Sequence, residues 1–279
     1  MAQSTKSNNT LSLVIILIYA ILPIVYVKTL VDNTLIPHQL FASVGIIVLA
    51  LLMFTVKGIK NLFPTWALVS YTGFVLVNVV AVSAAINPVE GWATVSRYMV
   101  PLAMFASLLL LFQSKKIEPQ HLIKGVMIFG SIASVITLFQ LLKALGSGDF
   151  ISNIYVVSGS FSHKNLLSSA LMLSLPFGIM GAMVLEKGWK NLGMVLTFLL
   201  IAEIFVLRTR GVWLGVFVSA FVFVLLFFVL RKKESLQVKF PIKYIAVAAG
   251  LAVVVLVGLF SATQVSDDVS STTNLENRI

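Results

Sequence analysis

The sequence predicts an all-α protein, a bundle of helices that crosses a lipid bilayer about nine times. Of its 279 residues, 59% are hydrophobic and only 11% are charged, and the mean hydropathy is +1.02. Soluble domains have roughly 45–50% apolar and about 25% charged residues, so this chain has too few polar side chains to cover a water-facing surface. Its apolar residues form continuous runs, whereas membrane β-strands alternate between apolar and polar side chains. In lipid the backbone must satisfy its own hydrogen bonds, which here leaves helices.

Nine apolar runs have about the length of a membrane span. Crossing about 30 Å of hydrocarbon at about 1.5 Å per residue takes about 20 residues. The first run is too long for the apolar core of a signal peptide and lacks a cleavage site of small residues, so we expect it to remain as an anchor. The fourth and seventh runs are the shortest. In order, the runs cover residues 11–30, 39–56, 65–86, 98–112, 122–145, 166–185, 192–207, 212–230 and 244–262.

The basic residues orient this bundle. If the N-terminus is cytoplasmic, 13 of the 20 basic residues lie on the cytoplasmic side and seven lie outside. Cytoplasmic connections of membrane proteins are enriched in Lys and Arg, so the sequence predicts a cytoplasmic N-terminus. With nine spans, the C-terminus is then extracytoplasmic. The outside set is Lys28, Arg97, Lys143, Lys164, Arg208, Arg210 and Arg278.

The composition also bounds the function. The formal charge of +10 comes from residues spread over the breaks between apolar runs, not from one basic patch, so nucleic acid is not indicated as a partner. There is no cysteine, and the three histidines, His38, His121 and His163, have no metal-ligand spacing. Neither a metal site nor a cofactor is predicted. Residues 1–263 form one membrane domain, and the polar residues 264–279 are either a short external tail or the start of a truncated external loop.

Two arginines occupy the connection between the seventh and eighth runs. Arg208 and Arg210 lie within Leu-Arg-Thr-Arg-Gly, which leaves almost no loop to lift them into water. We expect both guanidinium groups at or just below the membrane interface, where arginine is disfavoured unless its side chain reaches water. One interpretation is an anion site, because a guanidinium stays charged and matches phosphate with a rigid fork of donors. The alternative is an interfacial anchor, or an ion pair with Glu203 two helical turns before Arg210.

A second polar cluster, residues 158–165, stands outside, where the sixth run begins. His163, Lys164 and Asn165 lie at the helix start, and Ser168 follows on the same face as Asn165. Small polar groups on one face favour hydrogen bonds inside a bundle. His163 is a candidate proton acceptor or phosphate donor because its pKa is ordinarily near neutrality. The alternative is helix capping by Ser162 or a nearby polar residue, with ordinary packing between helices. Residues 211–215, a Gly-x-x-x-Gly, are predicted to pack helices together.

Three segments together resemble the O-antigen ligase and O-antigen polymerase superfamily. Residues 159–170, GSFSHKNLLSSA, with Leu-Pro-Phe at 175–177, resemble its Gly-x-Phe-x-x-x-Asn-Leu-x-small stretch. Residues 209–215 resemble its Ser-Arg-Gly turn and the helix that follows. Residues 271–279 are similar to the approach to an arginine, here Arg278, that precedes the family's large external loop. The resemblance covers nearly the whole chain but only the first two-thirds or so of a typical member, which continues with that loop, its histidine and further spans.

The resemblance implies a metal-independent, inverting glycan transferase of the bacterial inner membrane. Such an enzyme moves a saccharide from a polyprenyl-diphosphate carrier to a hydroxyl of a glycan, lipid or protein acceptor, in cell-surface polysaccharide assembly. It implies that Arg210, with Arg208 and Arg278, binds the diphosphate, and that His163, Lys164 and Asn165 line the acceptor or phosphate side. The general base is expected in the loop that this chain lacks.

Two other functions stay open on the sequence. A small-anion transporter or channel would use the arginines as a filter, although no paired helix-breaking segments typical of transporters are found. An inactive, truncated membrane fragment is the third possibility. The sugar, the acceptor and the oligomeric state do not follow from these residues.

Overall fold

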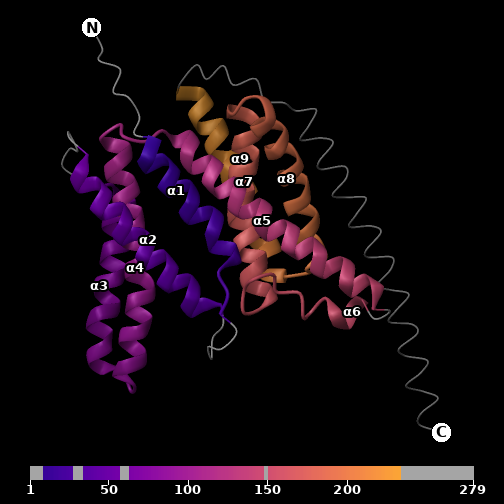
Figure 1. Cartoon of the computed structure of the whole chain (residues 1–279), viewed down its shortest axis with the longest axis horizontal. Helices are drawn as coiled ribbons and strands as arrows, with labels where there is room; N and C mark the ends of the chain where they lie inside the picture. Colours follow the sequence, from indigo (N-terminus) through magenta and orange to yellow (C-terminus); the bar gives the residue numbers. More distant parts are fainter. Residues whose placement is uncertain (1–8, 28–33, 57–62, 148–149, 234–279) are drawn as a thin grey trace.

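The computed structural model of the protein describes residues 9–27, 34–56, 63–147 and 150–233, and the regular secondary structure of these residues is helical (Figure 1). No strand occurs in these ranges. Two short 3-10 turns, Leu22–Ile24 and Val82–Ala84, extend the first and third helices. The helices are α1 (Asn9–Ile21), α2 (Leu35–Thr55), α3 (Trp66–Ala81), α4 (Pro88–Gln113), α5 (Pro119–Gly146), α6 (Phe150–Asn153), α7 (Lys164–Val184), α8 (Lys187–Val206) and α9 (Arg210–Lys233).

Six of these helices are long and apolar enough to cross a membrane, namely α2, α3, α4, α5, α7 and α8. The protein is therefore a multi-pass membrane protein. Large apolar side chains such as Phe54, Trp66 and Val80 are exposed on the outside of the bundle, where lipid would cover them. Eight of the nine predicted runs overlap α1, α2, α3, α4, α5, α7, α8 and α9, and the ninth, residues 244–262, lies outside the described residues.

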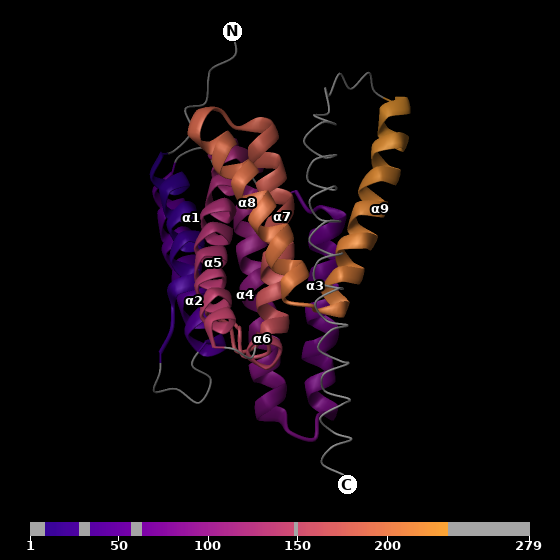
Figure 2. The same ribbon diagram turned by 90° about the vertical axis from the view of Figure 1, so that its right-hand side faces the viewer.

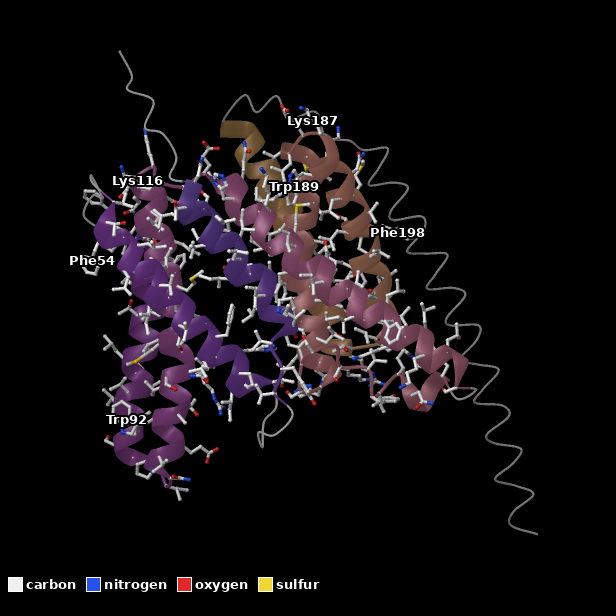
Figure 3. The ribbon with its side chains drawn as sticks, in the orientation of Figure 1. Phe54, Trp92, Lys116, Lys187, Trp189 and Phe198 are labelled. Carbon is white, nitrogen blue, oxygen red and sulfur yellow. The ribbon has the colours of Figure 1, made fainter. Side chains whose placement is uncertain are left out.

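Successive long helices run in opposite directions (Figures 1 and 2). Lys116 and Lys187 therefore lie at one end of the bundle and Trp92 at the other (Figure 3). We call the end with Trp92 the lower end, as it appears in Figure 1. At the lower end α1, α3, α5 and α8 finish and α2, α4, α7 and α9 begin. This brings the two polar clusters, which are far apart in the sequence, to the same end of the molecule.

The bundle is organised around α5. Helix α5 contacts α1 on one side and both α7 and α8 on the other, and α7 and α8 make the most extensive pair. Glycines let α7 and α8 approach closely, because a Cβ atom on Gly193 would lie 2.5 Å from the backbone nitrogen of Ala182. The larger buried cluster joins α5, α7, α8 and the start of α9, and a smaller one joins α1, α2 and α4. The two polar clusters thus lie next to the larger buried cluster, at the lower ends of α7, α8 and α9.

The fourth span is longer than predicted. The apolar run begins at position 98, but α4 begins at Pro88 and has 26 residues. Asn87 caps it, since its side chain accepts a hydrogen bond from the backbone nitrogen of Glu90 at 3.3 Å. Arg97, which the sequence places before the span, lies inside the helix. The amide nitrogen of Gln39, near the start of α2, donates to the Ser96 hydroxyl at 3.1 Å, so Arg97 is level with the lower end of α2.

Candidate functional site

The segment that leads into α7 is anchored by one side chain of α5. The amide oxygen of Gln140 accepts from the backbone nitrogens of Ser158 at 3.1 Å and Gly159 at 2.9 Å. Its amide nitrogen donates to the carbonyl of Gly159 at 3.0 Å. A glutamine side chain here supplies three of the hydrogen bonds that an irregular backbone needs near a membrane. This role of Gln140 was not predicted from the sequence, because its partners lie 18 and 19 residues away.

Glycine is required at the centre of this segment. Gly159 has φ of +63°, in the left-handed region that side chains disfavour. A Cβ atom at this position would also lie 2.9 Å from a methyl carbon of Leu167 on α7. Two residues later, the half-buried ring of Phe161 packs edge-on against His38 of α2, at 5.7 Å between ring centroids, and against Phe129 of α5. The segment before α7 thus contacts both α2 and α5.

Lys164 is held at the start of α7 by an aromatic ring. Its ammonium nitrogen lies 3.5 Å from the centroid of the Tyr155 ring, a cation–π contact. His163 is the N-cap of α7, but its side chain makes no capping hydrogen bond, and the first turn has no acidic residue. His163 and Asn165 are exposed. Side-chain capping by Ser162 or a nearby polar residue, the alternative considered for this cluster, is therefore not seen at α7. The positive end of this helix carries a cation instead of an acid.

The connection between α8 and α9 is a tight turn built around a buried threonine. Arg208 has φ of 53°, and Thr209, which follows it, is buried. The Thr209 hydroxyl lies 2.9 Å from the hydroxyl of Ser168 on α7, so the two can share a hydrogen bond. The prediction that small polar groups of α7 bond inside the bundle is confirmed for Ser168. Ser169 instead bonds back to the carbonyl of Asn165.

Both arginines of the turn are exposed, one on each side of Thr209. Arg210 is the first residue of α9, whose first turn also has no acidic residue. The charges of Arg208 and Lys164 lie close enough to repel each other. The hydrogen-bond contact between Ser168, one helical turn after Lys164, and Thr209, next to Arg208, places both cations at the same end of α7. The N-termini of α7 and α9 add further positive potential there. Such an arrangement is suited to an anion.

The ion pair considered for Arg210 does not form. Glu203 is only 2% exposed, and its carboxylate accepts from the Ser134 hydroxyl of α5 at 2.9 Å. Its other oxygen has no hydrogen-bond partner among the described residues. The helix stops at Val206 and the chain turns at Arg208, so Glu203 and Arg210 do not share one continuous helical face. Among the described residues, Arg210 therefore stays exposed and does not pair with Glu203.

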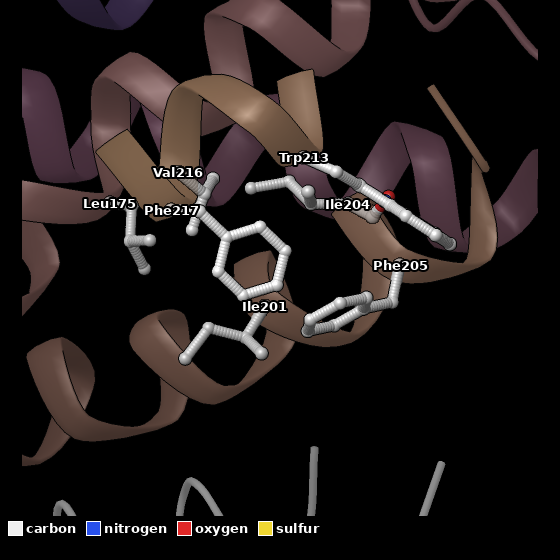
Figure 4. A pocket seen from close by; sticks show the side chains of 7 residues that line it. All are labelled: Leu175, Ile201, Ile204, Phe205, Trp213, Val216 and Phe217. Atoms are coloured by element: carbon white, nitrogen blue, oxygen red, sulfur yellow. The ribbon is translucent and has the colours of Figure 1, made fainter. Parts of the chain in front are cut away.

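An apolar groove begins within one helical turn of the arginines. It is a shallow, solvent-open groove between α7, α8 and α9 (Figure 4). Phe205 and Trp213 flank the turn in sequence, and their ring centroids are 5.6 Å apart. The Trp213 ring nitrogen donates to the carbonyl of Ile204 at 3.0 Å, so it presents only carbon to the groove. The lining is Leu175, Ile201, Ile204, Phe205, Trp213, Val216 and Phe217.

The Gly-x-x-x-Gly at the start of α9 packs at one position only. A Cβ atom on Gly215 would lie 3.0 Å from the sulfur of Met172 on α7, whereas one on Gly211 would meet nothing within 4 Å. The prediction of a helix-packing motif is therefore confirmed for Gly215, whereas no described residue lies against Gly211.

One predicted site residue remains to be placed. Arg278 lies outside the described residues.

Among the residues that the structure describes, no three His, Cys, Asp or Glu side chains are grouped as metal ligands. Comparisons of the chain with protein-family models, with curated proteins and with solved structures find no match.

Proposed function

We propose that this protein is a membrane glycan transferase that moves a saccharide from a polyprenyl-diphosphate carrier to an acceptor hydroxyl. One observation carries the proposal. Arg208 and Arg210 are exposed at the end of a membrane bundle, with Lys164 near Arg208, and a wholly apolar groove begins beside them. Cations next to an apolar groove fit an amphiphile with an anionic head and a hydrocarbon chain.

The diphosphate and the hydrocarbon chain of such a donor each have a counterpart at this site. A guanidinium binds phosphate oxygens with two parallel hydrogen bonds and stays charged when partly dehydrated. The groove offers the hydrocarbon chain the rings of Phe205, Trp213 and Phe217, with no polar group facing it. A free inorganic anion would need the cations but not the groove. This favours the lipid-linked donor over a small-anion transporter.

The same cations suit the chemistry. The acceptor oxygen would attack the anomeric carbon with inversion, forming the new glycosidic bond as the bond from that carbon to the diphosphate oxygen breaks. Negative charge then grows on the leaving lipid diphosphate, where fixed guanidinium groups stabilise it. Arg210 would carry most of this role, with Arg208 contributing and, as the family resemblance implies, Arg278 as well. The hydroxyl proton would go to a base outside the described residues, and His163 and Asn165 would line the acceptor side.

The proposal includes nine spans, a cytoplasmic N-terminus and an extracytoplasmic C-terminus, in a bacterial inner membrane. The upper ends of the described helices hold Lys115, Lys116, Lys124, Lys187 and Lys190, as cytoplasmic ends do. The lower end, with the candidate site, would then face the extracytoplasmic side, where lipid-linked saccharides would be used. Glycan, lipid and protein acceptors are all compatible with it, and nucleic acid is not a proposed partner.

Substituting Arg210 tests the function. Arg210→Ala in the complete protein should lower transfer from a polyprenyl-diphosphate-linked saccharide by about 10²–10³-fold, the effect of removing one charge-stabilising donor. Arg210→Lys should retain part of the activity, since it keeps the charge without the fork. Arg97→Ala is the matched control, an exposed arginine of the same end but on α4. All variants should remain in the membrane. Normal transfer by Arg210→Ala would remove this residue from the mechanism.

The sidedness can be measured separately because the chain has no cysteine. Arg208→Cys and Arg210→Cys should react with a membrane-impermeant thiol reagent added outside intact cells. Lys187→Cys, at the opposite end, should react only after the membrane is opened. Labelling of positions 208 and 210 from the cytosol alone would refute the proposed orientation and the donor site with it.

A further inference from the structure

Tyr155 is an exposed aromatic residue with no role in the site as proposed so far. Its side chain is 65% exposed, although both Ile154 before it and Val157 after it are buried. Those two neighbours and the hydrogen bonds from Gln140 to residues 158 and 159 fix the backbone on either side of the ring. The exposed ring of Tyr155 thus belongs to an anchored segment, so it can hold a neighbouring side chain in place.

The side chain that contacts the Tyr155 ring is that of Lys164, whose ammonium nitrogen lies 3.5 Å from the ring centroid. A lysine side chain is flexible, and holding it in one geometry loses rotamer freedom. Here the ring orders the ammonium before any ligand arrives, while the Arg208 charge nearby repels it. The ring covers one side of the ammonium, and its remaining N–H groups are left for an anion.

We infer that Tyr155 is a positioning residue of the anion site, whose ring holds the Lys164 ammonium beside Arg208 so that both cations meet the same diphosphate. This inference rests on the proposed function. Without the ring, the flexible lysine side chain would sample several rotamers, and binding would have to order it. The hydroxyl of Tyr155 is not needed, because the contact is to the ring face.

A double-mutant cycle on the complete protein tests this role. Binding of farnesyl diphosphate, as a short polyprenyl diphosphate, is measured in detergent for Tyr155→Phe and Tyr155→Leu. The phenylalanine variant should bind like the wild type, and the leucine variant about two- to fivefold more weakly. In a Lys164→Met background, Tyr155→Leu should have no further effect. Val156→Ala, at an exposed position of the same segment, should leave binding unchanged.

Two results would overturn the inference. One is binding by Tyr155→Leu equal to that of the wild type, and the other is an undiminished effect of this change in the Lys164→Met background. If Arg208→Met with Arg210→Met still weakens binding, only the role of Tyr155 fails. If the arginine variant binds normally, the donor site itself fails.

A measurement without ligand tests only whether the Lys164 ammonium lies against the Tyr155 ring. The Lys164 methylene next to the ammonium should show an upfield ring-current shift in nuclear magnetic resonance, in the wild type and in Tyr155→Phe. The shift should vanish in Tyr155→Leu. A Lys164 signal without any upfield shift in the wild type would refute the contact, whatever the ligand does.

Discussion

Replacing Gln140 by leucine should release the segment that carries Tyr155 and Lys164. The change removes three hydrogen bonds to Ser158 and Gly159, of 3.1, 2.9 and 3.0 Å, and keeps a similar side-chain volume. One intramolecular hydrogen bond contributes about 0.5–1.5 kcal/mol net, so three give about 1.5–4.5 kcal/mol. Because Ser158 and Gly159 are half-buried, water can replace part of this. We therefore expect the substitution to lower the free energy of local opening of the segment by about 1.5–3 kcal/mol.

Hydrogen exchange detects this opening directly. A loss of about 1.5–3 kcal/mol should speed exchange of the Ser158 and Gly159 amides by about 10- to 100-fold, at 1.4 kcal/mol per factor of ten. Peptides from the middle of α5 should exchange as in the wild type, because they share no partner with Gln140. Mass spectrometry of the complete protein in detergent gives both rates in one experiment.

Gln140→Glu is the matched variant. A carboxylate keeps the acceptor for both backbone nitrogens but cannot donate to the Gly159 carbonyl. Its exchange rates should lie between those of the wild type and of Gln140→Leu. Equal exchange in all three proteins would show that the segment is held by its buried apolar residues, and that the hydrogen bonds add nothing measurable.

Two further predictions concern the packing beneath the site. Gly159→Ala should lower the free energy of unfolding by at least about 1–2 kcal/mol, since its φ of +63° is left-handed and its Cβ meets Leu167 at 2.9 Å. Gly146→Ala, where a Cβ atom meets nothing within 4 Å, should be neutral or stabilising in a denaturation series. Ser168→Ala and Thr209→Val should each cost about 1–3 kcal/mol, because each leaves a buried hydroxyl unbonded. The double variant should lose less than the sum, and strict additivity would contradict a shared bond.

The spans could be predicted because hydropathy sums over about 20 residues, so no single side chain decides the result. Their ends could not, as α4 shows. The hydropathy of α4 falls before position 98 because Glu90, Thr94, Ser96 and Arg97 interrupt the apolar run. The helix nevertheless starts at Pro88, with Asn87 as its cap. Asn-Pro followed by an acid is a local helix-start signal, and it would have corrected the boundary.

The candidate site was predictable where it depends on topology. An even number of helix crossings between Lys164 and Arg208 places both at the same end, and the structure brings their charges near each other. Contacts made by tertiary folding were not predictable. Nothing in the sequence relates Gln140 to Gly159 or Tyr155 to Lys164, because neither pair has a helical spacing. Glu203 was misjudged for a related reason, since its predicted pairing assumed a helix that instead ends at Val206.

The backbone beneath each cation is fixed more firmly than the cation itself. Arg208 and Arg210 flank Thr209, which is buried and within hydrogen-bond distance of Ser168, so their Cα atoms are tied to α7 even though both side chains are exposed. Lys164 follows a segment that Gln140 holds. A site built in this way loses little freedom on binding, since only side-chain ends must be ordered. Because the same hydrogen bond joins the start of α7 to that of α9, breaking it should weaken anion binding as well as stability. If Thr209→Val lowered stability alone, the cations would have to be positioned by something other than this turn.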